Sequence, residues 1–184
     1  MSDGLETLQQ HLKGQKGKPP LDLWHPQLSG DIDIVIKANG DWFHDGSKIK
    51  RQRLIKLFST ILRREDDGDY YLLTPVEKWR IQVEQTALMI IDMDVVNAGH
   101  ADQKIIFTTN VDEQYTMGSS YPLQVSLSES STEPVPIVSL DQQLTAKVGR
   151  AVFYRLADLA VEKQGSFFVL SDGCEFELDA KKTS

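Results

Sequence analysis

Two segments with the same apolar spacing constrain the fold of this chain more than any other feature. In residues 48–64, apolar side chains recur at the three- and four-residue intervals of a helix with one buried face. A second such helix is expected from about residue 142 to about residue 164. The two apolar stripes superpose at a constant offset, with Leu54, Phe58, Ile61 and Leu62 aligned to Val152, Leu156, Leu159 and Ala160.

Short alternating segments around each helix predict strands. Ile32, Ile34 and Ile36 have the period of a half-buried strand, and "NGD" at 39–41 is a strong hairpin signal. After the first helix, "YYLLT" (70–74) and "WRIQVE" (79–84) are expected to form two strands. The second half contains the expected strands "PLQVSL" (122–127), "PVPIVSL" (134–140), "SFFVL" (166–170) and "CEFEL" (174–178). The order hairpin, helix, hairpin therefore occurs twice, which indicates an internal duplication.

The duplication predicts an α+β fold of two fused modules, each a sheet with one long helix. We expect an N-terminal helix and linker in residues 1–18, a first module in residues 19–85 and a second module in residues 86–184. Residues 87–118 have no counterpart in the first half, and their apolar runs predict extra strands of the second module. A chain of 184 residues is long enough for two small modules with cores of their own.

Composition and motifs exclude several classes of protein. The apolar runs are far shorter than the ~20 residues of a membrane-spanning helix, so no membrane insertion is expected. The N-terminus lacks the pattern of a secretory signal, which predicts a cytoplasmic protein, and one Cys excludes an internal disulfide. No GxSxG, P-loop, GxGxxG or zinc-type spacing occurs, so no cofactor, metal site or catalytic residue is predicted. A non-enzymatic function is expected, and an enzyme of an unrecognised type stays open.

The positive charge of the chain is concentrated in residues 46–64, "GSKIKRQRLIKLFSTILRR". Seven of the 20 Lys and Arg residues fall in this segment and none of the 27 acids does, so 13 bases face 27 acids elsewhere. Such a segment predicts either an acidic partner or an acidic sister module. The acidity of the whole chain disfavours generic nucleic-acid binding, but a nucleic-acid or nucleotide binder that uses residues 48–64 is the alternative function.

The start of this helix is the first candidate site. Ser47 has the side chain of a good N-cap, and Lys48, Lys50 and Arg51 add positive charge to the positive end of the helix dipole. A bound anion would relieve this mismatch through the helix amides and the cations, with His44 just before them. Neutralisation by acidic groups elsewhere in the chain is the alternative explanation. A small anionic ligand is the partner that this pattern predicts.

"TPVEK" at 74–78 lies between two expected strands and is the second candidate. Glu77 and Lys78 place one acid and one base at the edge of a turn. A Glu on a tight loop can act as a general acid or base. The sequence supplies no nucleophile or metal donor beside it, so a turn with an ion pair is the alternative.

Arg150 and Tyr154 stand one helical turn apart in the second expected helix. An Arg with an aromatic side chain can stack on a flat ligand. If the modules are pseudo-symmetric, Arg51 and Arg150 approach one another across the interface. We therefore include Arg150 and Tyr154 among the expected ligand-binding residues.

Several stretches resemble an uncharacterised bacterial family of domains of unknown function. They include residues 31–84, "IIFTTN" and "RAVFYRLADLA", and the most specific pieces are "TPVEK" and "RAVFY". The resemblance covers most of residues 19–178. It implies a duplicated two-module core, a C-terminal module like a pleckstrin-homology domain, a ligand site between the modules and a role in bacterial signalling.

The residues and the resemblance together predict a ligand-sensing or regulatory protein. We expect it to be cytoplasmic and non-enzymatic, and to bind a small anionic molecule at the interface of its two modules. The sequence does not exclude nucleic acid as a partner, and it leaves self-association into a homo-oligomer open.

Overall fold

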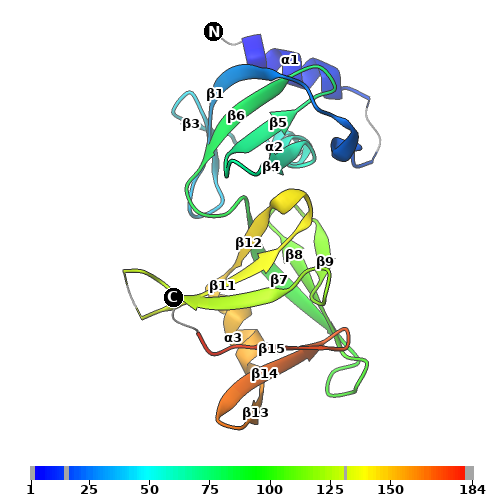
Figure 1. Ribbon diagram of the computed structural model, residues 1–184, viewed down its shortest axis with the longest axis vertical. Helices are drawn as coiled ribbons and strands as arrows, with labels where there is room; N and C mark the ends of the chain where they lie inside the picture. The colour runs from blue at the N-terminus through cyan, green and yellow to red at the C-terminus, as the bar shows by residue number, and fades with distance from the viewer. Residues whose placement is uncertain (1–2, 15–16, 131, 181–184) are drawn as a thin grey trace. The chain divides into compact units, whose positions relative to one another are not determined.

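The computed structural model describes residues 3–14, 17–130 and 132–180 (Figure 1). Contacts divide the chain into two compact units: unit 1 contains residues 1–87 with 141–144, and unit 2 contains residues 88–140 with 145–184. The described residues form three α-helices, two six-stranded sheets in two similar modules and a small third sheet. The predicted α+β fold with a duplicated core is confirmed.

Unit 1 contains one sheet and two α-helices. The helices are α1 (Asp3–Leu12) and α2 (Gln52–Ser59), with the short 3-10 helices η1 (Leu21–Leu23) and η2 (Asp141–Gln143). The strands are β1 (Leu28–Ile36), β2 (Trp42–His44), β3 (Ser47–Lys48), β4 (Leu62–Arg64), β5 (Tyr70–Leu73) and β6 (Lys78–Val83). Their order is β3-β2-β1-β6-β5-β4, and β1 and β6 form the parallel pair.

The first expected helix, residues 48–64, is wrong at both ends. Asp45 and Gly46 have φ values of 47° and 72°, so they form a tight turn that pairs His44 with Ser47. Ser47 and Lys48 therefore lie on β3, and α2 begins only at Gln52. The Asp-Gly pair was a hairpin signal that outweighs the capping potential of Ser47.

The C-terminal end of α2 is set by side-chain competition and by strand pairing. The hydroxyls of Ser59 and Thr60 donate to the carbonyls of Lys56 and Leu57, each at 2.7 Å, and such bonds compete with helix continuation. The residues of β4 then pair with β5 across the turn at 65–69. Strand pairing thus removes residues 62–64 from the expected helix.

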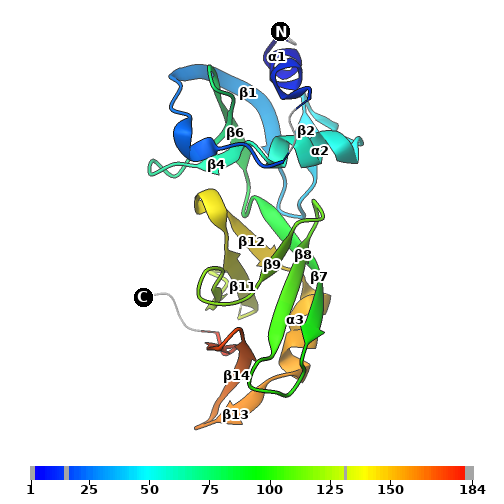
Figure 2. The ribbon, with the colours of Figure 1, turned by 90° about the vertical axis from the view of Figure 1, so that its right-hand side faces the viewer.

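The core of unit 1 lies between the sheet and its helices. Figure 2 shows α1 and α2 on the same side of the sheet. The amphipathic helix α1 buries Leu8 and Leu12, and α2 buries Phe58 completely against the sheet. The Phe58 ring stacks on Trp42, which is also fully buried, at 6.3 Å between ring centroids.

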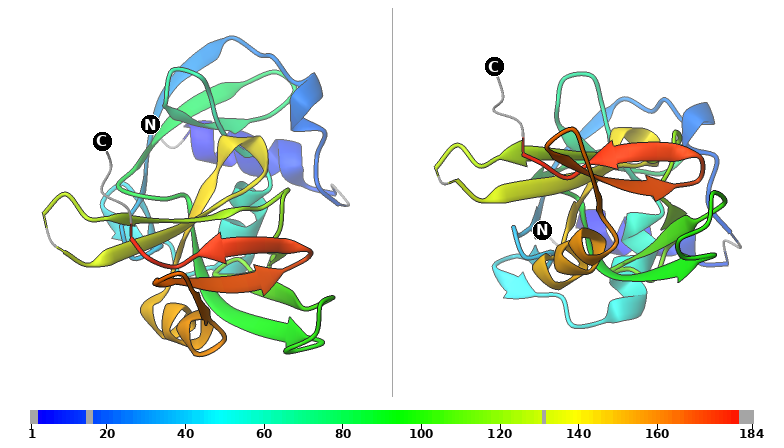
Figure 3. Two further views of the ribbon diagram at one scale, coloured as in Figure 1. Left: turned by 60° about the horizontal axis from the view of Figure 1, so that its bottom comes forward. Right: turned by 90° about the horizontal axis from the view of Figure 1, so that it is seen from below.

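Unit 2 contains a six-stranded sheet, one helix and a three-stranded sheet. The first sheet has β7 (Leu88–Val96), β8 (Lys104–Thr109), β9 (Gln114–Thr116), β10 (Leu123–Leu127), β11 (Pro134–Ser139) and β12 (Thr145–Val148). The helix is α3 (Arg150–Asp158), and the third sheet has β13 (Val161–Lys163), β14 (Ser166–Ser171) and β15 (Cys174–Glu177). Figure 3 shows this third sheet as a separate ribbon near α3.

The two six-stranded sheets have the same topology. The order β10-β11-β12-β7-β8-β9 repeats β4-β5-β6-β1-β2-β3, and in each sheet the one parallel pair joins the two three-stranded meanders. In this correspondence β7–β9 hold the place of β1–β3. The added part of unit 2 is therefore α3 with β13–β15 rather than the strands expected in residues 87–118.

The second expected helix, from about 142 to 164, is also too long. Leu144, Ala146 and Val148 are buried in alternation, which is the period of a strand, and β12 pairs with β7. At the other end, Gln164 and Gly165 have positive φ values and turn β13 onto β14. Only residues 150–158 remain helical, and they bury Val152 and Leu156.

Candidate functional site

A cavity at the start of α3 contains two of the expected site residues. Its volume is about 400 Å³, and it lies within unit 2. The lining residues come from β7, β11, β12 and α3 or directly adjoin them: Met89, Glu133, Pro134, Pro136, Lys147, Val148, Gly149, Arg150, Phe153 and Tyr154. We call it the α3 pocket.

The backbone around Gly149 brings the start of α3 to this cavity. Gly149 is the N-cap of the helix, and its N–H donates to the Ile90 carbonyl at 2.9 Å. A Cβ at this position would lie 2.9 Å from the same carbonyl oxygen, so the close approach to β7 requires glycine. Glycine offers no side chain to cap the helix, and no side-chain cap hydrogen bond is present. The N–H groups of the first turn of α3 therefore receive no hydrogen-bond acceptor from an N-cap side chain.

Arg150 and Tyr154 form a cation–aromatic pair at the rim of the pocket. Arg150 Nε donates to the Tyr154 hydroxyl at 2.9 Å, and its guanidinium carbon lies 5.7 Å from the ring centroid. The hydrogen bond to Tyr154, with the nearby Glu133 carboxylate, raises the pKa of Arg150. Among the described residues Arg150 makes no other hydrogen bond. Its terminal nitrogens can therefore bind a carboxylate or phosphate in the bidentate manner typical of arginine.

The other lining residues determine which ligand chemistry the pocket can accept. Lys147 adds a second cation and Glu133 adds one carboxylate, so the lining carries a net positive charge. Phe153 and the two prolines provide apolar walls. The lining includes no Ser, Thr, Cys or His, and its one hydroxyl, that of Tyr154, accepts a hydrogen bond from Arg150. The two cations beside apolar walls give the pocket the surface that an anion with an apolar body requires.

Three of the other expected residues, His44, Ser47 and Lys48, lie in unit 1 on strands and not at a helix start. His44 is on β2 with Nε2 3.6 Å from the Asp45 carboxylate. Ser47 and Lys48 lie on β3, and Lys48 forms an ion pair of 2.8 Å with Asp41. The hydroxyl of Ser47 is therefore not the cap that its sequence position suggested.

Lys50 and Arg51 precede α2 and are both exposed. Arg51 occupies the N-cap position, where it makes no side-chain cap hydrogen bond. These two residues are thus the part of the expected anion site that stays next to the helix amides. Arg51 belongs to unit 1 and Arg150 to unit 2, and their approach across the interface stays a prediction.

The "TPVEK" turn has a structural network beside it. The Thr74 hydroxyl accepts from Glu77 N at 3.0 Å and holds the turn. Lys78 forms its ion pair with Glu65, at 2.8 Å, and lies 4.6 Å from the centroid of the Tyr71 ring. Glu77 has one buried carboxylate oxygen with no hydrogen-bond partner in the described residues, 3.9 Å from His11 Nδ1.

Glu65 is the centre of that network. Burial alone would raise its pKa, but hydrogen bonds from Lys78 and Arg63 outweigh burial and hold the pKa of Glu65 below its ordinary value. Arg63 also donates to the carbonyls of Leu21 and Trp24, each at 3.1 Å. The expected site residue Lys78 therefore takes part in fixing the segment around η1 to the sheet.

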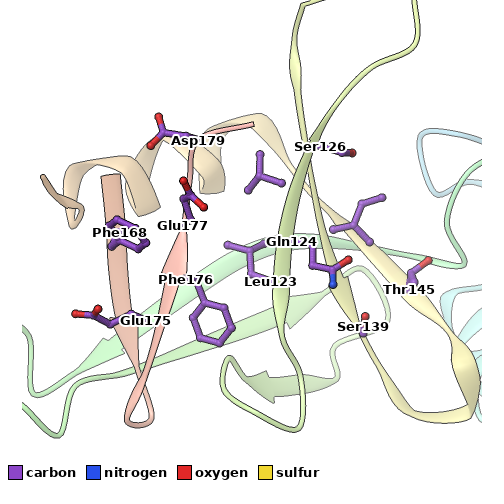
Figure 4. A pocket seen from close by; sticks show the side chains of 12 residues that line it. Leu123, Gln124, Ser126, Ser139, Thr145, Phe168, Glu175, Phe176, Glu177 and Asp179 are labelled. Carbon is purple, nitrogen blue, oxygen red and sulfur yellow. The ribbon is translucent and has the colours of Figure 1, made fainter. Parts of the chain in front are cut away.

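A second cavity of about 640 Å³ in unit 2 contains none of the expected site residues. It lies between the outer face of β10–β12 and β15 (Figure 4), and we call it the β10–β15 groove. The alternation of Glu and Phe in "CEFEL" was the available signal for an acidic, partly apolar wall. For the α3 pocket, the missed signal was the two-residue period of Leu144, Ala146 and Val148, which places Lys147 on a strand.

Two classes of site are absent from the part of the chain that the structure describes. No group of three or more His, Cys, Asp or Glu side chains there is arranged to hold a metal ion. None of the helices in the described ranges has the length and apolar character required to span a bilayer.

Fold and site together define a protein of two similar α+β units with a cation-lined cavity. Residues 19–86 match the N-terminal domain of DUF1285, a domain of unknown function, and residues 87–178 match the C-terminal domain of DUF1285 proteins, which are of unknown function. The chain belongs to the DUF1285 family. This confirms the resemblance to a family of unknown function, whereas the pleckstrin-homology likeness is not confirmed.

Two solved structures are similar to this chain. A DUF1285 family protein from Silicibacter pomeroyi DSS-3 is 35% identical, with a TM-score of 0.86 and 94% of each chain covered. A DUF1285 family protein from Shewanella baltica OS155 is 29% identical, with a TM-score of 0.55, and the match covers 68% of this chain and 91% of that one. No curated protein matches the chain.

Proposed function

We propose that this protein is a non-enzymatic ligand-sensing or regulatory protein that binds a small anionic molecule in the α3 pocket. The observation that carries the proposal is Arg150. It lines a cavity of about 400 Å³, is oriented by Tyr154, and has terminal nitrogens that make no hydrogen bond among the described residues. Cavities of roughly 300–1,000 Å³ are typical of small-molecule sites.

Three features of the pocket support an anion rather than a neutral or cationic ligand. The guanidinium of Arg150 and the ammonium of Lys147 both line it. The amides of the first turn of α3 have no side-chain cap, and helix amides favour negative charge. Glu133 opposes an anion, so we expect the ligand's charged group to bind next to Arg150 and its apolar part next to Phe153.

This proposal moves the anion site relative to the sequence-based expectation. The expected site lay at the interface of the modules and included residues of the basic segment. The α3 pocket is formed by unit 2 alone. A contribution of His44, Ser47, Lys48, Lys50, Arg51, Glu77 or Lys78 to the same ligand stays a prediction.

The test is a thermal-shift screen with nucleotides, phosphorylated metabolites and carboxylates, carried out on three forms of the full chain. A ligand at about 100 times its Kd stabilises the folded state by about 2.7 kcal/mol, which is a readily measured shift. We expect a ligand that stabilises the wild type and fails to stabilise Arg150→Gln. Arg53→Gln is the matched control, because it removes one charge from an exposed arginine in unit 1.

The proposal has a defined failure. A ligand that stabilises Arg150→Gln as strongly as the wild type does not use the α3 pocket. Turnover of a screened compound by the purified protein, lost in Arg150→Gln, would contradict the non-enzymatic part of the proposal.

A second candidate function, nucleic-acid binding, has one observation in its favour. Lys50, Arg51 and Arg53 are exposed and close in sequence, and none makes an ion pair among the described residues. For a nucleic acid that neutralises several phosphates, the logarithm of the binding constant falls steeply and linearly with the logarithm of salt concentration. Glu in place of Lys50 and Arg51 should then abolish binding, whereas the response to a small ligand in the α3 pocket should persist.

A further inference from the structure

The β10–β15 groove differs in charge from the α3 pocket. Its lining includes three carboxylates, from Glu175, Glu177 and Asp179, and none of its lining residues is Lys, Arg or His. Its apolar surface comes from both walls, as Figure 4 shows for three labelled side chains: Leu123, Phe168 and Phe176. The groove thus combines an acidic rim with an apolar floor.

One wall of the groove is the open edge of a sheet. Among the described residues, β10 is the last strand of its sheet and pairs only with β11. Ser128 N donates to the Glu133 carbonyl at 3.1 Å, so Ser128 and Glu133 form a hydrogen-bonded pair of the antiparallel ladder. Hydrogen-bonded pairs alternate along such a ladder, so the next ones are Ser126 with Val135 and Gln124 with Ile137. The main-chain N–H and C=O groups of the intervening residues point away from β11, and these residues are Leu123, Val125 and Leu127.

The other wall is also an open edge. β15 is the last strand of the third sheet and pairs with β14. Leu178 N donates to the Phe167 carbonyl at 2.8 Å, so by the same alternation the main chain of Glu175 points away from β14. Open edges of this kind can accept an added strand, and acidic side chains along them select against strands of the same charge.

We propose that the β10–β15 groove binds an extended peptide segment of a partner protein in which Lys or Arg alternates with apolar residues. The carboxylates of Glu175, Glu177 and Asp179 complement the cations, and Phe168 and Phe176 contact the apolar side chains. The main-chain groups of one open edge bind the peptide backbone. A strand presents alternate side chains to opposite sides, so one peptide can satisfy both kinds of surface.

This groove is distinct from the α3 pocket, because the two cavities share no lining residue. Nucleic acid and anionic ligands are disfavoured here, since they would face three carboxylates. A free polyamine would satisfy the carboxylates but would leave the open strand edges without partners.

The test is fluorescence polarisation with labelled peptides of about seven residues, a common strand length. The probe alternates Lys with Val or Leu, and three comparison ligands accompany it. One peptide replaces each Lys by Glu, one keeps the sequence but is N-methylated at every second residue, and spermidine is the competitor. We expect saturable binding of the basic peptide, at least about tenfold weaker binding of the N-methylated peptide, and none of the acidic peptide.

A charge swap on the protein tests the groove while keeping its fold. Glu175 forms an exposed ion pair with Lys163, which does not line the groove. The double variant Lys163→Glu, Glu175→Lys keeps the pair and puts a cation into the groove, so peptide binding should fall at least about tenfold. The matched control swaps the exposed ion pair between Lys37 and Glu84 in unit 1 and should bind as the wild type does.

Each other outcome overturns the proposal. Equal binding of the parent and N-methylated peptides, with spermidine as an effective competitor, would show a site for cations alone. Unchanged binding in the Lys163/Glu175 swap, with a far-UV spectrum like the wild type, would place the peptide elsewhere. Absence of peptide binding to the wild type would show that the acidic residues only protect an exposed strand edge.

Discussion

The segment from α2 to β6 and the segment from α3 to β15 have the same order of elements but different surroundings. Each has a short helix followed by a three-stranded meander. In unit 1 the last strand of the meander, β6, pairs in parallel with β1 and completes the six-stranded sheet. In unit 2 the place beside β7 is taken by β12, so β13–β15 form a sheet of their own.

This difference shows how an added helix and meander create a new surface. In the part of the chain that the structure describes, β15 pairs only with β14, so one of its edges is open, and the β10–β15 groove is bounded by that edge and by β10. In the meander that follows α2, the last strand, β6, has partners on both sides. The groove therefore follows from the added segment of α3 and β13–β15, whose last strand has one partner in its sheet.

Two aligned aromatic residues show the same contrast at the level of side chains. When "YYLL" of β5 is placed on "FFVL" of β14, which takes one residue out of the loop before β14, Tyr71 coincides with Phe168. Tyr71 is buried, and its hydroxyl donates to Asp67 at 2.6 Å. Phe168 is half-buried, has no hydroxyl and lines the groove. The position that closes the core of unit 1 is part of an accessible surface in unit 2.

The largest expected effect tests whether each helix stabilises its own unit. Phe58→Ala in α2 and Leu156→Ala in α3 both remove a fully buried side chain. Such truncations cost about 3–5 kcal/mol for Phe and about 2–5 kcal/mol for Leu. Trp24, Trp42 and Trp79 all belong to unit 1, so tryptophan fluorescence in a urea titration follows unit 1, and far-UV circular dichroism follows both units.

We expect Phe58→Ala to lower the urea midpoint of the fluorescence transition, and Leu156→Ala to lower a transition seen by circular dichroism. If both variants lower the fluorescence midpoint equally, the two units unfold as one. The prediction that each helix stabilises its own unit would then be wrong.

The order of elements was largely predictable because turn signals and two-residue periods are local. "NGD" predicted the β1–β2 hairpin. Helix ends were not predictable from apolar spacing alone. Residues 62–64 and 161–163 continue the apolar stripe of a helix, and only pairing with the next strand removes them from it. Pairing is a tertiary effect that a helical period does not encode.

The candidate site was predictable only in part. Arg150 and Tyr154 were identified by their spacing, and they do form a contact. Lys147 was missed because residues 142–164 were interpreted as one helix, which placed it away from Pro134 and Pro136. The groove could not be predicted, since β10 and β15 are neighbours only because β12 has taken the place beside β7.

The second prediction compares the ion pairs of the two meanders. Arg63 has a side chain only 14% exposed and binds Glu65 and two carbonyls near η1. Arg63→Ala should destabilise unit 1 by about 2–4 kcal/mol, because the Trp24 carbonyl loses its donor and the half-buried Glu65 loses one of its two cations. Lys163, in β13, is 49% exposed in its pair with Glu175. Lys163→Ala should cost less than about 1 kcal/mol, as exposed pairs do.

Urea titration measures both effects, and the fluorescence of Trp24 should shift to longer wavelength in Arg63→Ala as the segment around η1 is released. If the two variants lose the same free energy of unfolding, the greater burial of the Arg63 network does not make it more stabilising than the exposed Lys163–Glu175 pair.

The smallest expected effect concerns the hydroxyl that distinguishes Tyr71 from Phe168. The hydrogen bond to Asp67, followed by burial, raises the pKa of Tyr71 to about 12. A tyrosine whose pKa is raised on folding favours the folded state below its ordinary pKa of about 10, and this contribution is lost as the pH rises from about 10 to about 12. The wild type should therefore lose more stability over this range than Tyr71→Phe does.

Ultraviolet titration of tyrosine ionisation checks the same assignment directly. We expect a component near pH 12 in the wild type that disappears in Tyr71→Phe and persists in the control Tyr70→Phe. Phe168→Tyr completes the comparison, because Phe168 lines the groove. With "YYLL" placed on "FFVL", the residue that aligns with Asp67 is Gln164, which has no carboxylate. The new hydroxyl in Phe168→Tyr should therefore add no component near pH 12. If it does add one, the two meanders offer the same environment to this position, and the contrast between the closed core of unit 1 and the open groove of unit 2 does not hold at the level of single side chains.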